Sequence, residues 1–150
     1  MRLVLALFLC LVAWFPAEAA TGRVMKVLPH LLDLKGRHAL SPSLYERDAY
    51  QALLREHPEK QSGLRFDVQW KAVGAAPESL KLRVEVRGMA HGDLPEQIVL
   101  EKLVKPGRWR RWDDLILQGN DFQTVGQVTA WRVSLWDNAD LLAEQKSFLW

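Results

Sequence analysis

Cysteine is almost absent from this chain: among 150 residues, Cys10 is the only one. One thiol forms no internal disulfide and falls short of a thiol-ligated metal site. Cys10 also lies in an amino-terminal segment that we expect to be removed, so the mature chain would hold no thiol nucleophile. The fold must therefore depend on a buried apolar core, for which a chain of this length is sufficient.

Long apolar runs are absent as well. The longest begins at Leu3 and has 13 residues, whereas a membrane-spanning helix needs roughly 20. A basic residue precedes the run, and Pro16 and small residues follow it, which is the order of a secretory signal peptide. We expect residues 1–19 to be a signal peptide cleaved after Ala19, rather than a retained anchor. Residues 20–150 would then form one secreted or periplasmic domain with no membrane span.

Motifs of catalysis and metal binding are missing too. The sequence has neither the G-x-S-x-G turn of serine hydrolases nor a glycine-rich phosphate loop. The histidines fall in separate segments without the spacing of metal ligands, and we expect each to be a surface imidazole; they are His30, His38, His57 and His91. The sequence therefore predicts a non-enzymatic protein with no catalytic residue, no metal and no cofactor, and a hydrolase is the least favoured alternative.

Carboxylates at turns leave one metal hypothesis open. Asp137 and Asp140 share a predicted four-residue hairpin turn, and Asn120 and Asp121 lie in another loop. Calcium requires six to eight oxygen ligands, which usually come from several such loops. Asp and Asn are also common at turns because their side chains bond to the nearby backbone. We favour this turn role over calcium binding.

Neither sign of charge is in large excess. The chain has 20 Lys and Arg against 18 Asp and Glu, which gives a net charge of +2, and the two signs are interleaved along it. Such interleaving is typical of solvated strand faces. Because the excess is too small to indicate nucleic-acid binding, we expect no nucleic-acid partner.

Alternating apolar residues are the main feature that is present. LRFDVQWKAV (residues 64–73) and LKLRVEVR (residues 80–87) place apolar and polar side chains on opposite faces, which is the pattern of strands with one solvated face. Pro29 assigns the first predicted strand to a sheet edge. The predicted fold is a mainly β, antiparallel sandwich of two sheets. Its seven strands are residues 24–34, 64–73, 80–88, 96–104, 109–117, 128–136 and 141–149.

One helix is predicted between the first two strands, at about residues 42–57. Either Ser41 with Pro42 or Ser43 with Glu46 can cap its start. The three- and four-residue spacing predicts one apolar and one solvated face. We expect Tyr45, Ala49, Ala52 and Leu53 to face the sheet, and Glu46, Arg47, Gln51 and Arg55 to face water.

The segment GRWRRWDDLIL, residues 107–117, conflicts with strict alternation. If the leucines at its end face the core, Arg111 and Asp113 fall on the same side, where burial would be costly. A bulge at Asp113 and Asp114 would remove this conflict. Trp112 would then turn into the core, and Arg111 would face outward.

The strand pattern resembles the immunoglobulin-like and fibronectin type III group over residues 24–149. Trp70 lies in the second strand, where such domains often keep a core tryptophan, and Trp131-x-Val133-x-Leu135 resembles their penultimate strand. The terminal hairpin is also similar to that of short secreted bacterial proteins of unknown function. The chain departs from the group in having no cysteine pair and an inserted helix. The resemblance implies an immunoglobulin-like architecture and no particular activity.

Six tryptophans remain after the predicted signal peptide, and we assign Trp70, Trp112 and Trp131 to the core. The other three, with nearby arginines, would form a flat aromatic and cationic platform if they cluster. This candidate surface comprises Trp109, Arg110, Arg111, Arg132, Trp136 and Trp150. Alternatively, each of these indoles is half-buried against its neighbours. The sequence thus predicts a binding or assembly module with a protein or polysaccharide partner, and a small carbohydrate-binding module is the alternative.

Overall fold

The computed structural model describes residues 19–89 and 96–150. The signal peptide predicted for residues 1–19 lies outside this part except for Ala19, and His91 lies outside it too. The strands in chain order are β1 (Thr21–Asp33), β2 (Gln61–Val73), β3 (Leu80–Met89), β4 (Glu96–Leu103), β5 (Gly107–Gln118), β6 (Gln127–Asp137) and β7 (Asp140–Lys146). The helices are α2 (Leu44–Glu56), the short 3-10 helix η1 (Pro58–Lys60) and α3 (Gly119–Val125).

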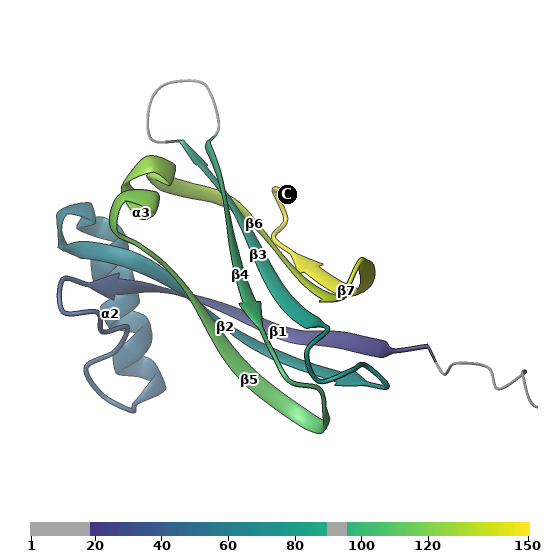
Figure 1. Ribbon diagram of the computed structural model, residues 1–150. Coiled ribbons are helices and arrows are strands. Elements are labelled where there is room, and N and C mark those ends of the chain that lie inside the picture. Colours follow the sequence, from purple (N-terminus) through teal and green to yellow (C-terminus); the bar gives the residue numbers. More distant parts are fainter. Residues whose placement is uncertain (1–18, 90–95) are drawn as a thin grey trace, which may run out of the picture.

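The strands form two antiparallel sheets (Figure 1). Sheet A has three strands in the order β1-β2-β5, and sheet B has four in the order β4-β3-β6-β7. β1 contacts β7 on one side and β4 contacts β5 on the other, so the two sheets meet at both margins. The predicted mainly β fold, with seven strands in two antiparallel sheets, is confirmed. β1, which carries Pro29, is an edge strand as expected.

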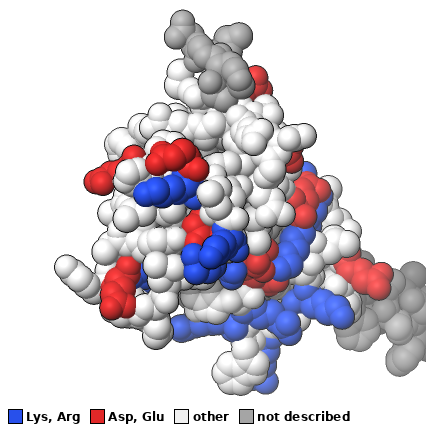
Figure 2. Space-filling model, turned by 90° about the vertical axis from the view of Figure 1, so that its left-hand side faces the viewer, with Lys and Arg blue, Asp and Glu red and all other residues white. Residues whose placement is uncertain are grey.

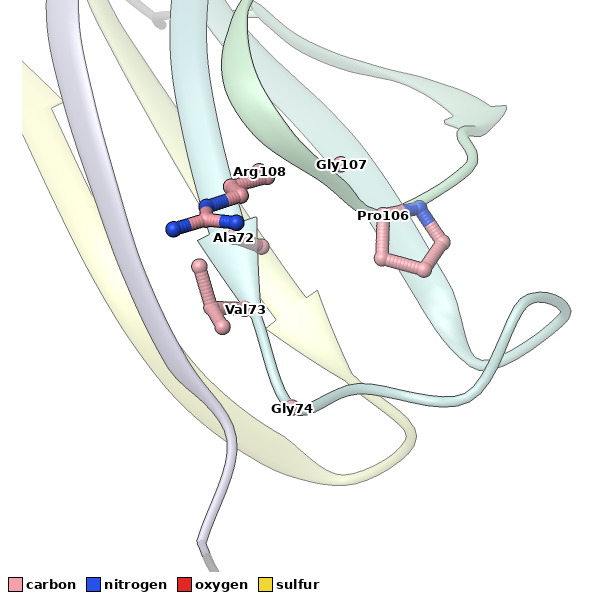
Figure 3. A pocket seen from close by; sticks show the side chains of 6 residues that line it. All are labelled: Ala72, Val73, Gly74, Pro106, Gly107 and Arg108. Carbon is pink, nitrogen blue, oxygen red and sulfur yellow. The ribbon is translucent and has the colours of Figure 1, made fainter.

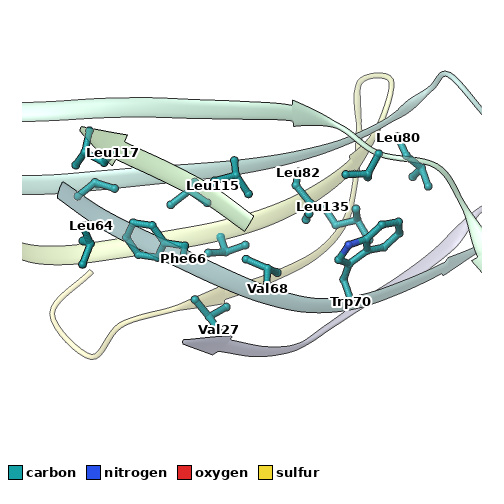
Figure 4. Close-up of a cluster of buried hydrophobic side chains, with 14 of the residues drawn as sticks. Val27, Leu64, Phe66, Val68, Trp70, Leu80, Leu82, Leu115, Leu117 and Leu135 are labelled. Atoms are coloured by element: carbon teal, nitrogen blue, oxygen red, sulfur yellow. The ribbon is translucent and has the colours of Figure 1, made fainter. Parts of the chain in front are cut away.

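The core lies between the two sheets and is built from every second residue of the central strands (Figure 4). Phe66, Val68 and Trp70 of β2 are fully buried, and the intervening Asp67 and Gln69 lie on the solvated face. The same alternation in β3, β5 and β6 completes the cluster. Its leucines are Leu64, Leu80, Leu82, Leu115, Leu117 and Leu135.

The helix α2 buries a different face from the predicted one. Its cap is Ser43, whose hydroxyl accepts a hydrogen bond from the Glu46 amide. Gln51 is buried instead of solvated, whereas Tyr45 is 83% exposed. The Gln51 amide oxygen accepts a hydrogen bond from the Leu31 amide, and its NH₂ group donates to the Leu31 carbonyl. A polar side chain therefore docks α2 on β1, because it satisfies backbone groups that an apolar side chain would leave unpaired.

Two connections also differ in detail from the prediction. The chain crosses from sheet A to sheet B through α3, where the sequence analysis expected an irregular loop. With only seven residues and no side-chain hydrogen bond at its cap, α3 lacks the usual sequence signals of a helix. The β6–β7 hairpin turns within two residues, since Asp137 and Asp140 are paired and Asn138 adopts the left-handed region with φ of 51°.

The strand β5 contains no bulge at Asp113 and Asp114. Pairing with β2 is regular from Gln118 back to Arg111, and the irregularity lies nearer the start of β5. Trp112 consequently faces outward and is 50% exposed, so its assignment to the core is wrong. Arg111 and Asp113 both fall on the core side of β5, so the expectation that Arg111 faces outward is wrong, although Arg111 remains exposed near the end of the sheet. The Trp70 indole N–H donates a hydrogen bond of 2.9 Å to the Asp113 carboxylate. This bond reduces the cost of placing Asp113 on the core side, which the sequence analysis overestimated.

Gly88 of β3 offers a test of how closely the chain packs before β6. A methyl group at this position would overlap the Val125 carbonyl and would lie 2.7 Å from the Gln127 carbonyl oxygen. Gly88→Ala should lower the free energy of unfolding by about 2–3 kcal/mol, measured by urea denaturation. Gly36→Ala is the control, because Gly36 has no atom nearby and a φ of 75°. It should lose only about 1 kcal/mol through backbone strain, and equal losses would contradict the packing explanation.

Candidate functional site

The six residues of the predicted surface fall into two groups on different sheets. Trp109, Arg110 and Arg111 belong to β5 of sheet A, whereas Arg132 and Trp136 belong to β6 of sheet B. Trp150 follows β7 and lies against Arg87 and Arg132. The structure therefore offers two separate aromatic and cationic surfaces.

The group on sheet B is largely occupied by contacts within the chain. The Trp150 ring lies under two guanidinium groups, with centroid distances of 3.8 Å to Arg87 and 4.9 Å to Arg132. Arg132 also pairs with the buried Glu85 at 2.6 Å. The Trp136 indole N–H donates to the Ser134 hydroxyl. These side chains stabilise the outer face of sheet B and have few free donors or ring faces.

The side chains of the group on β5 are exposed to solvent. Trp109 is 81% exposed, and Trp112, which the sequence analysis had placed in the core, is also at the surface. Arg108, Arg110 and Arg111 are exposed as well. Over residues 19–89 and 96–150, none of these three arginines forms an ion pair with a carboxylate. We call residues 108–112 the β5 surface.

A bulge shapes the β5 surface. Trp70 pairs with Arg111 and Ala72 pairs with Gly107, so three residues of β5, 108–110, lie opposite Lys71 alone. Bulges of this kind redirect side chains and are frequent next to binding sites. A side chain at Gly107 would come within 2.6 Å of the Arg111 Nε, so the Arg111 side chain would have to move to make room for it.

A shallow hollow of about 340 Å³ borders this bulge (Figure 3). It lies between the end of β2, at Val73 and Gly74, and the start of β5, at Pro106 and Gly107. The Arg108 side chain extends from β5 toward Val73 across the hollow. The hollow is mostly apolar and open, and it is continuous with the β5 surface. It is too shallow to enclose a small molecule.

An ion-pair cluster holds the other half of β5 in place. Lys102 of β4 pairs with Asp113 at 3.0 Å and with Asp114 at 3.3 Å, which ties sheet B to sheet A. Burial lowers the pKa of Lys102, but the two aspartates outweigh it and raise the pKa above its ordinary value. Both carboxylates of the Asp113–Asp114 pair are thus used internally and do not neutralise the arginines before them.

The histidines are less separate than their spacing suggested. His30 and His38 stack with ring centroids 5.2 Å apart, and His30 lies 3.7 Å from Asp67. The side chain of His30 is largely buried, so it is not the surface imidazole that we expected. Burial lowers its pKa, and the attraction of Asp67 offsets this only in part. The contact of β1 with the loop before α2 creates this pair, and no sequence spacing reveals it.

The turn residues that could have formed a calcium site lie in two separate parts of the structure. Asn120 and Asp121 lie in α3, and Asp137 and Asp140 lie at the hairpin beyond the far end of β6. Among the described residues, no group of three or more His, Cys, Asp or Glu side chains could hold a metal ion. No helix in the same part of the chain is long and apolar enough to span a membrane.

Comparisons with known proteins assign no family to this arrangement. No protein-family model matches the sequence, no curated protein matches it, and no solved structure matches the chain.

Proposed function

We propose that the protein is an exported, non-enzymatic binding or assembly module that holds its ligand on the β5 surface. The observation that carries this proposal is the high exposure of Trp109 and Trp112 beside three arginines without carboxylate partners. Large exposed aromatic side chains next to Arg are typical of binding surfaces. The proposed ligand is a macromolecule of the periplasm or the cell exterior, either a polysaccharide or a protein.

An immunoglobulin-like scaffold in the fibronectin type III arrangement is part of the proposal. Support comes from the strand orders β1-β2-β5 and β4-β3-β6-β7, since two antiparallel sheets of three and four strands that enclose one core are also the architecture of that group. The fully buried Trp70 in the second strand agrees with the sequence resemblance. The helix α2 between β1 and β2 would be an addition to this scaffold.

A double substitution, Trp109→Ala with Trp112→Ala, tests the proposed surface. Because both side chains are largely exposed, the free energy of unfolding should change by no more than about 1 kcal/mol. Retention of cell-envelope polysaccharide or protein on the immobilised chain should fall at least about tenfold, as for other aromatic contact residues. Fluorescence of the remaining tryptophans reports folding, and quantified retention from fractionated envelope extract reports binding.

Trp136→Ala is the matched control for this experiment. It removes an indole from the outer face of sheet B, where Trp136 bonds to Ser134, and should leave retention unchanged. If the double variant on β5 retained as much material as the unaltered chain, the proposed surface would be wrong.

A small carbohydrate-binding module is the second candidate. The exposure of the Trp109 and Trp112 side chains favours it, because sugar rings present apolar faces that can pack against indoles. Titration with neutral and charged polysaccharides, followed by tryptophan fluorescence, separates this candidate from a protein-binding module.

A further inference from the structure

Basic side chains converge at the end of sheet A where β1 begins, β2 ends and β5 begins. The strand and loop segments 19–26, 69–77 and 103–112 that meet there contain no Asp or Glu. Asp113 and Asp114 follow directly in β5, where both pair with Lys102. We call this region the cationic end of sheet A. Its basic residues are Arg23, Lys26, Lys71, Lys105, Arg108, Arg110 and Arg111.

The central row of the cationic end runs across all three strands. Arg23 of β1 is the register partner of Lys71 of β2. On the other side of Lys71 lies the bulge of β5, which carries Arg108 and Arg110. Neighbouring strands are about 4.8 Å apart, so the row places like charges within about 10 Å. This is close to the distance over which salt screens charges under physiological conditions.

Such a row is unfavourable without a counter-ion, because like charges directly opposite each other destabilise a sheet. Over the part of the chain that the structure describes, none of the seven basic residues forms an ion pair. The outer face of sheet B shows the opposite arrangement. There Lys81 and Arg83 both pair with Glu101, and Arg132 pairs with Glu85.

The carboxylates nearest to the cationic end in the sequence are Asp113 and Asp114 of β5, which Lys102 engages. Three further carboxylates belong to turns at the margin of sheet B. Glu78 lies in the β2–β3 turn, and Asp137 and Asp140 lie at the β6–β7 hairpin. None of these three turn residues lies on β1, β2 or β5. Figure 2 shows the side of the molecule on which α2 lies, at the opposite end of sheet A; acidic and basic side chains are mixed over most of this face, and basic side chains gather along its lower edge. The seven basic residues of the cationic end, which form no ion pair within residues 19–89 and 96–150, therefore make this region locally positive, although the net charge of the whole chain is only +2.

We propose that the cationic end of sheet A, together with Trp109 and Trp112, binds an acidic polysaccharide. This inference rests on the proposed function and names the ligand class of the same surface. Arginine guanidinium groups bind carboxylate or sulfate groups through paired hydrogen bonds. The two exposed indoles supply ring faces beside these charges.

The shape of the surface favours a polymer over a small anion. The hollow beside the β5 bulge is shallow and open, and the basic residues are spread over three strands instead of converging on one point. A repeating chain of charged sugars would contact several of them at once, and each contact would add to the affinity. The predicted export of the chain favours a polysaccharide over a nucleic acid.

Polygalacturonate and its fully methyl-esterified form are suitable probes, because they share a sugar backbone and differ in charge. The chain should bind polygalacturonate at least about tenfold more tightly than the ester at low salt. This preference should decrease strongly between 50 and 300 mM NaCl, since screening weakens exposed charge contacts. Isothermal titration calorimetry measures the affinity, and tryptophan fluorescence reports contact with the indoles.

The variant Lys71→Gln with Arg110→Gln should weaken polygalacturonate binding about tenfold, as expected from the loss of two exposed charge contacts. Its matched control is Arg55→Gln with Lys60→Gln, which removes the same net charge. Arg55 of α2 and Lys60 of η1 are exposed and lie beyond the opposite end of β2. The control should bind as the unaltered chain does, and both variants should unfold as it does.

Equal affinity for the two polymers, or equal weakening by the two variants, would overturn the inference. Tighter binding of poly-glutamate or of single-stranded DNA than of polygalacturonate would overturn it too. The proposed function would survive these results if envelope retention still depended on Trp109 and Trp112. It would fail separately if the indole substitutions had no effect on retention.

Discussion

Replacing Trp70 by alanine should lower the free energy of unfolding by about 3–5 kcal/mol, the largest loss that we expect from a single substitution in this chain. Trp70 is fully buried in the second half of β2, between the two sheets. Its removal leaves a large cavity that the surrounding leucines fill only in part. Since a domain of this size is stable by only about 5–15 kcal/mol, chemical denaturation should show a clear loss.

A second contribution comes from the indole N–H of Trp70. It donates to Asp113, whose carboxylate also pairs with Lys102. Trp70→Phe keeps most of the apolar contact and removes only this donor, so it should lose about 1–2 kcal/mol. The graded losses of the two variants would separate packing from hydrogen bonding.

Trp109→Ala is the control for the Trp70 series, because Trp109 lies on the same sheet and is largely exposed. We expect a change within about 0.5 kcal/mol. A loss at Trp109 as large as that at Trp70 would mean that β5 packs differently, and it would also remove the basis of the proposed binding surface.

Asp33→Ala should destabilise the chain by about 2–3 kcal/mol, through the loss of hydrogen bonds at a buried site. The Asp33 carboxylate accepts hydrogen bonds from the Lys35 and Arg37 amides and from the Tyr50 hydroxyl. It also pairs with the Arg37 guanidinium at 2.8 Å. Because Asp33 ends β1 and its partners come from the following loop and α2, the substitution should loosen the attachment of α2. Urea denaturation measures the loss, and proteolysis near α2 measures the local opening.

The same carboxylate should make stability depend on pH. Burial opposes ionisation of Asp33, but the hydrogen bonds from Arg37, Tyr50 and Lys35 outweigh it and hold the pKa well below its ordinary value of 3.8. A carboxylate with a lowered pKa in the folded state stabilises the fold fully above its unfolded pKa. This contribution is lost as the pH falls from about 4 toward the folded value. Asp33→Asn should therefore flatten the decrease in stability below pH 4.

Asp48→Ala serves as the control for Asp33, since the Asp48 side chain on α2 is 79% exposed. Its free energy of unfolding should change by no more than about 0.5 kcal/mol, and its decrease in stability below pH 4 should match that of the unaltered chain. If Asp33→Asn and Asp48→Ala had the same acid profile, the network around Asp33 would not be the source of the pH dependence.

The alternation of apolar residues was sufficient to predict the strands, because this pattern is a local property of the chain. In β2, each residue from Leu64 to Ala72 faces the side that its polarity predicts. Pro29 similarly indicated that β1 is an edge strand, since proline has no amide hydrogen to donate within a sheet. These features hold whichever strands pair with one another.

The candidate site was less predictable, because it depends on pairing between distant segments. Trp112 faces outward because β5 is regular where the sequence analysis placed a bulge, and Asp113 is accepted on the core side because Trp70 and Lys102 bind it. Plain alternation from Leu115 would have placed Trp112 correctly. The sequence does not show that the Trp70 indole on β2 donates a hydrogen bond to Asp113 on β5.

By itself, the sequence determined the mainly β fold, the seven strands and the presence of α2, because the periodicity of apolar residues and the helix cap depend only on residues that are close in the sequence. Only the tertiary structure decided which face of α2 is buried and where the charges of the chain gather. Arg23, Lys71 and Arg110 are far apart in the sequence, and each has ordinary neighbours there. The register of sheet A brings them to one end, because strand pairing and the β5 bulge depend on the free energy of the whole sheet and not on local sequence.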